Sequence, residues 1–261
     1  MPIQLVTIEG NIGSGKTTIA RHIASKIPDA VFFPAPTRSR NPHWEAFHSN
    51  PKAHAAKVQM WFLRERLRVY VTAMRHMKQT GESAILDFSL WSDEAFAQSH
   101  FENGFMTADE LEEYQQLSRA IFALKLPPPH LTILLHASPE VCLQRSKGLE
   151  SKRPESNAED YLRRLDELQR QRYVRDLDTV FTPRFLKSQR VPVDAPGLAP
   201  APSLMTLVRD WSDLQKVKPT AVIDAVMCTE PIEFDGWYAS FEAEGVAERV
   251  DALLGEQHQV A

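Results

Sequence analysis

Short, continuously apolar runs alternate along the chain with longer stretches in which apolar residues recur every three or four positions. The runs have the length and composition of strands buried on both faces of a sheet, and they lie at residues 3–8, 30–33, 83–89, 131–137 and 189–194. Within residues 55–78, Met60, Leu63 and Leu67 share one helix face. Gln59 and Arg66 are seven residues apart, so they also share a helix face. The alternation predicts an α/β fold in which helices cover both faces of a five-stranded parallel sheet.

Further helices are predicted from capping residues and from a change in composition. Thr107 and Glu110 have the spacing of a capping box, and helical stretches occupy residues 17–27, 92–101, 107–125 and 161–174, with another beginning at 138. From residue 195 the sequence is rich in Pro and Ala, so we expect one domain over residues 1–194 and a C-terminal extension over 195–261. The extension contains an expected helix, SLMTLVRDWSDLQ, and an aromatic group near Trp237 that either packs on the domain or docks to a partner.

Composition and charge exclude several classes of protein. The 261 residues carry a net charge of −4 and no basic block, which argues against nucleic acid as a partner. No apolar run approaches the ~18 residues of a membrane span, so no transmembrane segment is expected. Cys142 and Cys228 lack metal-site or disulfide spacing, and the histidines are interpreted as surface or polar packing residues. The first strand starts within three residues of Met1, which leaves no room for a transit peptide and favours the cytoplasm.

A phosphate-binding loop follows the first strand. The segment GNIGSGKT matches GxxxxGK[ST] and lies between a predicted strand and a predicted helix, the context in which this motif binds phosphate. Backbone N–H groups and the helix N-terminus would surround an anion, while Lys16 would reach the outer phosphates and Thr17 would hold magnesium. The residues expected to contact the nucleotide are Gly10, Asn11, Ile12, Gly13, Ser14, Gly15, Lys16, Thr17 and Thr18.

Four segments resemble the deoxyribonucleoside kinases. They are IEGNIGSGKTT, NPKAHAAKVQ, DFSLWSD, and SPEVCLQR followed by EDYL, and they occur in the family's order over about residues 3–194. The resemblance implies a P-loop NTPase-type three-layer α/β/α fold. It also implies that the chain binds ATP or another (deoxy)nucleoside triphosphate together with Mg²⁺, and a deoxynucleoside as a further ligand.

The resemblance assigns roles to five further residues. Gln59 would hydrogen-bond a nucleobase edge, Arg66 would flank the base, and Asp93 would support the pocket. Arg145 would reach the donor phosphates, and Asp87 would replace a family glutamate as a ligand of magnesium or water. The alternatives are that Gln59, Arg66 and Arg145 are solvated helix positions and that Asp93 caps a helix.

The chain departs from the family at positions that carry the chemistry. Ala35 replaces the glutamate of a Glu-Pro pair that acts on the attacking hydroxyl, and Phe88 replaces an arginine that neutralises the transferred phosphoryl group. Val58 replaces an aromatic residue that stacks on the base, so the base type is left open. The lid, the segment after residue 146 that closes over the phosphates in the family, differs as well. Leu149 and Ser151 occupy positions of family arginines, and Pro154 occupies that of an acid. The nearby cations that could partly replace the arginines are Lys147, Lys152 and Arg153.

These departures predict a nucleotide-binding protein whose phosphoryl-transfer site is impaired. Such a protein would act as an accessory subunit, like the family's kinase-like subunit of mitochondrial respiratory complex I, and would then lie on the matrix side with protein partners. The alternative is an active kinase that transfers the ATP γ-phosphate to a deoxynucleoside 5′-hydroxyl, with Glu45, Asp29 or Asp87 as the acid. A third hypothesis is an ATPase that hydrolyses ATP without a nucleoside acceptor.

Overall fold

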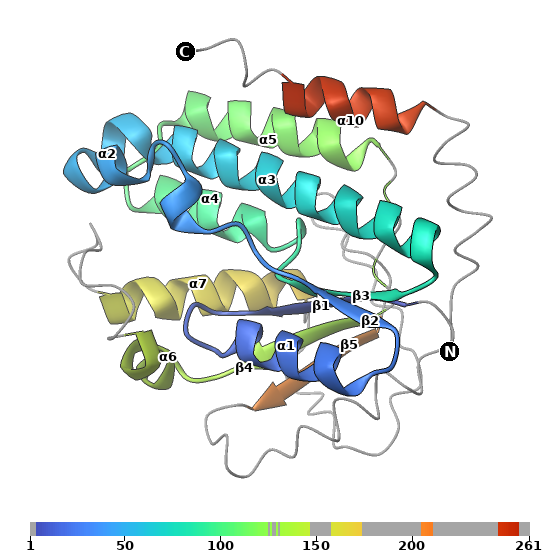
Figure 1. Cartoon of the computed structure of the whole chain (residues 1–261). Helices are drawn as coiled ribbons and strands as arrows, with labels where there is room; N and C mark the ends of the chain where they lie inside the picture. The colour runs from blue at the N-terminus through green and yellow to red at the C-terminus, as the bar shows by residue number, and fades with distance from the viewer. Residues whose placement is uncertain are drawn as a thin grey trace.

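The computed structural model of the chain describes residues 4–124, 126, 129, 131–146, 158–173, 205–210 and 245–255. Five parallel strands form one sheet in the order β2-β3-β1-β4-β5 (Figure 1). The strands are β1 (Leu5–Gly10), β2 (Ala30–Phe33), β3 (Ser83–Asp87), β4 (Leu131–His136) and β5 (Met205–Asp210). Because β1 is central, the loop that follows it emerges between the carboxyl ends of β3 and β4, where parallel sheets bind ligands.

Helices occupy the segments between and after the strands. They are α1 (Lys16–Lys26), the 3₁₀ turn η1 (Arg38–Arg40), α2 (Trp44–Ser49), α3 (Pro51–Thr80), α4 (Asp93–Glu102), α5 (Ala108–Phe122), α6 (Pro139–Ser146), α7 (Ala158–Tyr173) and α10 (Val246–Gly255). None of the helices in the described ranges is long and apolar enough to cross a membrane.

The alternating side chains of the central strands build two hydrophobic cores. Leu5 faces the core beneath α3, α5 and α10, whereas Val6 and Ile8 face the core against α1, α6 and α7. In Figure 1, α3, α5 and α10 lie above the sheet, whereas α1 and α6 lie below it. Coverage of both faces explains why the strands are continuously apolar.

The fifth strand is in a different place from the one predicted. Residues 189–194, the expected strand, lie outside the described residues, whereas β5 lies in the segment SLMTLVRDWSDLQ that was predicted to be a helix. Its register runs from Leu131 opposite Met205 to His136 opposite Asp210. Pairing with the free edge of β4 outweighs the local helix preference of this short apolar run. The sheet therefore extends past the domain boundary expected at residue 194.

The 30-residue helix α3 contributes Gln59 and Arg66 to the candidate site. Its N-terminus is capped by the Asn50 side chain, which accepts a hydrogen bond from the Ala53 N–H, and it ends at Gly81 in the left-handed conformation. The predicted capping box of Thr107 and Glu110 is present at α5. Two helices were not predicted: α2 lies in the expected polar loop, and α10 lies in the expected tail and packs on α3.

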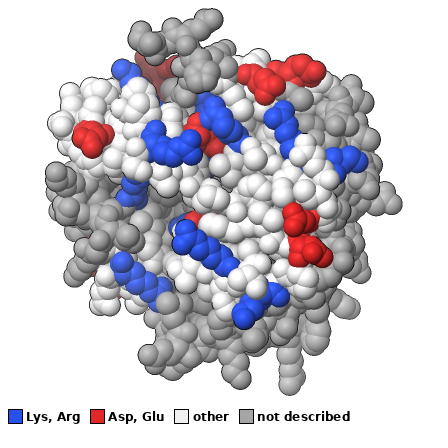
Figure 2. Space-filling model, in the orientation of Figure 1, with Lys and Arg blue, Asp and Glu red and all other residues white. Residues whose placement is uncertain are grey.

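Basic and acidic side chains are interspersed on the surface. On the face seen in Figure 2, described lysines and arginines are scattered among acidic and uncharged residues, and they do not gather into one basic stripe. This distribution agrees with the small net charge of −4.

Candidate nucleotide-binding site

The loop between β1 and α1 has a backbone that only glycine accommodates at two points. Gly10 (φ +137°) and Gly13 (φ +79°) both have left-handed backbones, and a Cβ would lie 2.4 Å from the carbonyl oxygen of Leu135 or Cys142, respectively. α1 begins directly after the loop, with no acidic residue in its first turn. Its unpaired N–H groups and positive dipole end therefore face the loop and suit a phosphate.

Lys16, Thr17 and Asp87 form a polar group at the mouth of this loop. Lys16 Nζ donates hydrogen bonds to the carbonyl oxygens of Gly10 (2.9 Å) and Asn11 (2.8 Å). Thr17 Oγ1 donates to Asp87 Oδ2 at 2.5 Å. Burial lowers the pKa of Lys16, and the carboxylates of Asp87 and Glu9 oppose that effect.

Asn11 and Arg145 attach the loop to the helices that follow β4. Asn11 Nδ2 donates to the Leu162 carbonyl of α7 at 2.7 Å, and its Oδ1 accepts from the Ile12 N–H at 2.8 Å. Arg145 of α6 donates to the Ser14 carbonyl at 3.4 Å. Arg145 therefore lies beside the loop, and its role toward the phosphates stays a prediction.

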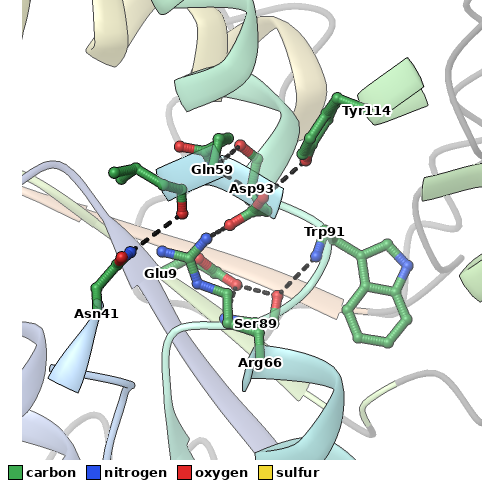
Figure 3. A network of polar contacts seen from close by, with 9 residues as sticks. Glu9, Asn41, Gln59, Arg66, Ser89, Trp91, Asp93 and Tyr114 are labelled. Carbon is green, nitrogen blue, oxygen red and sulfur yellow. Dashed lines mark hydrogen bonds and ion pairs between the residues drawn. The ribbon is translucent and has the colours of Figure 1, made fainter. Parts of the chain in front are cut away.

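Asp93 is the centre of a second polar group, shown in Figure 3. It is fully buried and forms an ion pair with Arg66. Gln59 Nε2 donates to Asp93 Oδ2 at 2.8 Å and to the Asp93 carbonyl at 3.3 Å, while the Tyr114 hydroxyl donates to Oδ2 at 2.7 Å. The predicted sharing of one helix face by Gln59 and Arg66 is confirmed, because both side chains reach the same carboxylate.

Three of the structural alternatives for this group are wrong. Gln59 is 3% exposed and the Arg66 side chain is 12% exposed, so neither is a solvated helix position. Asp93 is the first residue of α4 and binds side chains, so it is not a helix cap. Burial lowers the pKa of Arg66 to about 10, which leaves the guanidinium charged at neutral pH.

One cavity of about 240 Å³ connects the loop with the Asp93 group. Lys16, Thr17 and Asp87 border it at the loop, and Gln59 and Arg66 border it along α3. Aromatic side chains enclose the part between the helices: Trp44 and Phe47 from α2, Phe62 from α3 and Phe96 from α4. A phosphate cradle that opens into an aromatic chamber with an amide and a guanidinium has the form of a nucleotide or nucleoside site.

Ala35 and Phe88, the two departures from the family, also line this cavity. The Phe88 ring centroid lies 4.4 Å from the Arg66 guanidinium and 5.4 Å from Lys16 Nζ. Phe88 has a left-handed backbone, with φ 75°, which is strained for a residue with a side chain. An aromatic ring therefore occupies the space between the cation of the loop and the cation of the chamber.

Several residues of the site were missed by sequence reasoning. Glu9 lies in β1, directly before Gly10 of the phosphate loop, and is fully buried. Its Oε1 accepts hydrogen bonds from the Ser89 N–H (2.9 Å) and hydroxyl. Burial raises its pKa, while Ser89, Ser92, Lys16 and Arg66 oppose the rise. Arg38, which stacks on Trp44 at 5.0 Å, and His100 also line the cavity.

The acids suggested as substitutes for the lost glutamate differ in position. Asp29 and Glu45 are exposed and do not line the cavity, whereas Asp87 does. The lid residues near Lys147 and Arg153, and the aromatic group near Trp237, lie outside the described residues.

The fold is of the α/β class, and the loop after β1 has the sequence and the backbone conformation of a P-loop. The family model for deoxynucleoside kinase matches residues 6–190. The chain belongs to the deoxynucleoside kinase family.

Two curated relatives show how the family divides. The chain is 30% identical to the deoxyguanosine kinase of Dictyostelium discoideum over 163 residues, which cover 62% of this chain and 56% of the relative. It is also 30% identical to the bovine mitochondrial NADH dehydrogenase [ubiquinone] 1 alpha subcomplex subunit 10 over 158 residues, or 53% and 46% of the two chains. The chain spans about half the length of these curated relatives.

Solved structures of a deoxyadenosine kinase from M. mycoides have the same fold. The form with bound dATP gives a TM-score of 0.59 at 19% identity and covers 87% of this chain and 97% of that one. The form with bound dCTP gives a TM-score of 0.60 at 18% identity, with 85% and 96% covered.

Proposed function

We propose that this protein binds a nucleotide through its phosphate loop and a nucleoside in the adjoining chamber, but transfers phosphate poorly. One observation carries the proposal: Asp87 is the only carboxylate among the described cavity-lining residues, and it already accepts the Thr17 hydroxyl. Ala35 and Phe88 line the same cavity, and neither can accept a proton or neutralise a phosphate. The strand order and the loop position support a P-loop NTPase-type three-layer arrangement.

The expected loss of rate follows from the missing groups. A general base contributes about 10²- to 10⁴-fold to catalysis, and one preorganised electrostatic contact about 10²- to 10³-fold. The two losses are not fully additive. With family-type rates of ~1–100 per second as the starting point, turnover should fall below roughly 10⁻² per second.

The loop residues themselves fit a nucleotide with magnesium. Thr17 Oγ1 and Asp87 would hold the ion, because they are 2.5 Å apart and Asp87 Oδ1 has no hydrogen-bond partner in the described part of the chain. When bound, magnesium would neutralise phosphate charge. Lys16 would exchange its bonds to the Gly10 and Asn11 carbonyls for bonds to the phosphates. Gln59 and Arg66, held by Asp93, would orient the base.

A non-catalytic role in a larger assembly fits these features. The similarity to the bovine NADH dehydrogenase subunit supports a place as an accessory subunit of mitochondrial respiratory complex I or a related assembly, on its matrix side. In such a role the bound nucleotide would stabilise the fold, by mass action, and not be turned over. Copurification with a large complex would support this role, and a free protein with nucleoside turnover would contradict it.

An active deoxynucleoside kinase is the second candidate, and one observation favours it. The unpartnered Asp87 Oδ1 borders the same cavity as Lys16, so this carboxylate could serve the attacking hydroxyl. The similarity to a deoxyguanosine kinase supports the same candidate. A free kinase of this kind would be cytoplasmic.

Binding and transfer are tested separately. Calorimetry should show Mg·ATP binding by the wild type that Lys16→Ala weakens by ten-fold or more. Transfer from radiolabelled ATP to the four common deoxynucleosides should stay below roughly 10⁻² per second, and the double variant Ala35→Glu, Phe88→Arg should raise it at least ten-fold. Wild-type turnover near 1 per second would favour the second candidate. ATP hydrolysis that is independent of nucleoside would instead indicate an ATPase.

A further inference from the structure

His100 lies in the part of the cavity that is enclosed by helices. It shares one face of α4 with Asp93 and Phe96, seven residues after Asp93 and therefore about 10 Å further along the helix. Its ring packs edge-on against Phe47 of α2, with centroids 5.3 Å apart, and it lines the cavity. The phosphate loop borders the same cavity from the sheet, so His100 is placed to meet the far end of a ligand.

The His100 imidazole is buried without a protein partner. The residue is 6% exposed, and its Nδ1 has no hydrogen-bond partner among the residues that the structure describes. Burial lowers the pKa of His100 to about 4, so the ring is neutral at physiological pH. An unpaired buried polar atom costs about 1–3 kcal/mol, and most such atoms in proteins are paired. An apolar side chain would fill this place at lower cost, so the imidazole is expected to serve a ligand. Because Nδ1 is inaccessible, Nε2 is the ring nitrogen that a ligand in the cavity can meet.

The surroundings of the ring determine which nitrogen carries the proton. No described acceptor is within hydrogen-bond reach of Nδ1, so a proton there would be buried and unpaired. The neutral ring therefore favours the tautomer with its proton on Nε2. In that tautomer His100 offers the cavity one hydrogen-bond donor.

The Gln59 amide has a fixed orientation as well. Its Nε2 donates to both the Asp93 carboxylate and the Asp93 carbonyl, so both amide hydrogens are engaged. Only Oε1 remains for a ligand, and it is an acceptor. The chamber thus combines one acceptor from Gln59 with donors from Arg66 and His100.

We propose that His100 selects the nucleobase by donating a hydrogen bond to an exocyclic oxygen. The inference rests on the proposed function, in which the sugar's 5′ end faces the phosphate loop, so that position 6 of a purine or position 4 of a pyrimidine reaches furthest into the chamber. An exocyclic amino group at that position is itself a donor and could not accept the hydrogen bond from His100. A site that leaves a buried donor unpaired in this way rejects the wrong ligand strongly. The chamber therefore prefers oxo bases to amino bases.

Binding of matched nucleoside pairs to the full chain tests the selection. Deoxyinosine carries an oxo group at position 6 of the purine where deoxyadenosine carries an amino group. Deoxyuridine and deoxycytidine give the same comparison at position 4 of a pyrimidine. Calorimetry should show that the wild type binds the oxo member at least ten-fold more tightly in at least one pair. His100→Leu should reduce that ratio about ten-fold, because it removes the donor. His100→Gln, whose amide can place a donor near the position of Nε2, should retain most of it.

The outcomes separate this inference from the proposed function. The role of His100 would be overturned by a ratio that is unchanged in His100→Leu, by an equal loss for both members, or by a wild-type preference for the amino member. An absence of nucleoside binding would overturn it too, together with the nucleoside part of the proposed function. Lys16-dependent ATP binding would survive any of these results. Loss of that ATP binding would overturn the proposed function itself. Thermal melting of each variant confirms that a folded protein is compared.

Discussion

The Thr17 hydroxyl donates a 2.5 Å hydrogen bond to Asp87 Oδ2, which joins the first turn of α1 to the last residue of β3. Residues 70 positions apart in the sequence thus meet at the mouth of the phosphate loop. The second carboxylate oxygen of Asp87 is left without a hydrogen-bond partner among the described residues. This arrangement has a direct consequence for the metal dependence of binding.

Asp87→Asn should abolish the contribution of magnesium to ATP binding. The amide keeps the shape of the side chain but loses the charge that a hard cation prefers. The wild type should bind ATP more tightly with Mg²⁺ than with EDTA, and the variant should bind about equally in both, as measured by calorimetry. Asp29→Asn, an exposed acid outside the cavity, is the matched control. A magnesium effect that persists in Asp87→Asn would contradict the assignment.

Gly13→Ala should eliminate ATP binding while the chain still folds. The new Cβ would lie 2.4 Å from the Cys142 carbonyl oxygen, so the loop would have to move. Gly104→Ala is the control, because Gly104 has a similar positive φ (+69°) but no atom within 4 Å of the added Cβ. Comparing the two variants separates the backbone strain from the steric clash. Each variant should lose about 1–2 kcal/mol of stability through its backbone. ATP affinity is measured by equilibrium dialysis. Equal affinities of the wild type and Gly13→Ala would show that the loop tolerates the change.

Asp93→Ala should destabilise the fold far more than Tyr114→Phe. Removing the carboxylate leaves the Arg66 guanidinium, with a 12% exposed side chain, without its ion pair, which typically costs about 3–5 kcal/mol. Tyr114→Phe removes one 2.7 Å hydrogen bond, a loss of about 1 kcal/mol. Urea denaturation of both variants measures the difference. Similar losses would mean that Asp93 does not organise the group.

His100 should make the fold less stable in mild acid. Its pKa is about 4 in the folded chain and about 6.5 when unfolded, so between these values the unfolded chain holds a proton that the folded chain lacks. Stability therefore falls as the pH drops through this window, by about 2 kcal/mol between pH 7 and pH 5. His100→Leu should lose this part of the pH dependence in denaturation curves. If the stability of the wild type and of His100→Leu fell equally between pH 7 and pH 5, this prediction would be refuted.

Local patterns were sufficient to predict the loop and part of the chamber. The loop was found because its residues are contiguous and its strand–loop–helix context can be read directly. Gln59 and Arg66 were placed on one face because a separation of seven residues is two helical turns. Their common partner, Asp93, could be placed there only through the family resemblance.

The remaining features depend on tertiary contacts. His100 and Phe96 line the chamber only because α4 packs against α3 and α2, and nothing in the spacing of the histidines indicates this. Glu9 is a single polar residue that follows the apolar run at residues 3–8, and its contacts are seen only when the fold brings Ser89 beside it. Likewise, β5 is recognised by its pairing with β4 and not by its own sequence.

The position of β5 also bears on where the chain can be shortened. A protein ending at residue 194 would retain the loop and the chamber but would lose the strand that pairs with β4 from Leu131 to His136. The uncovered row of N–H and C=O groups on β4 would then be open to pairing with another molecule. Truncation at that apparent boundary should therefore yield aggregates, and the minimal soluble unit must reach at least to Asp210.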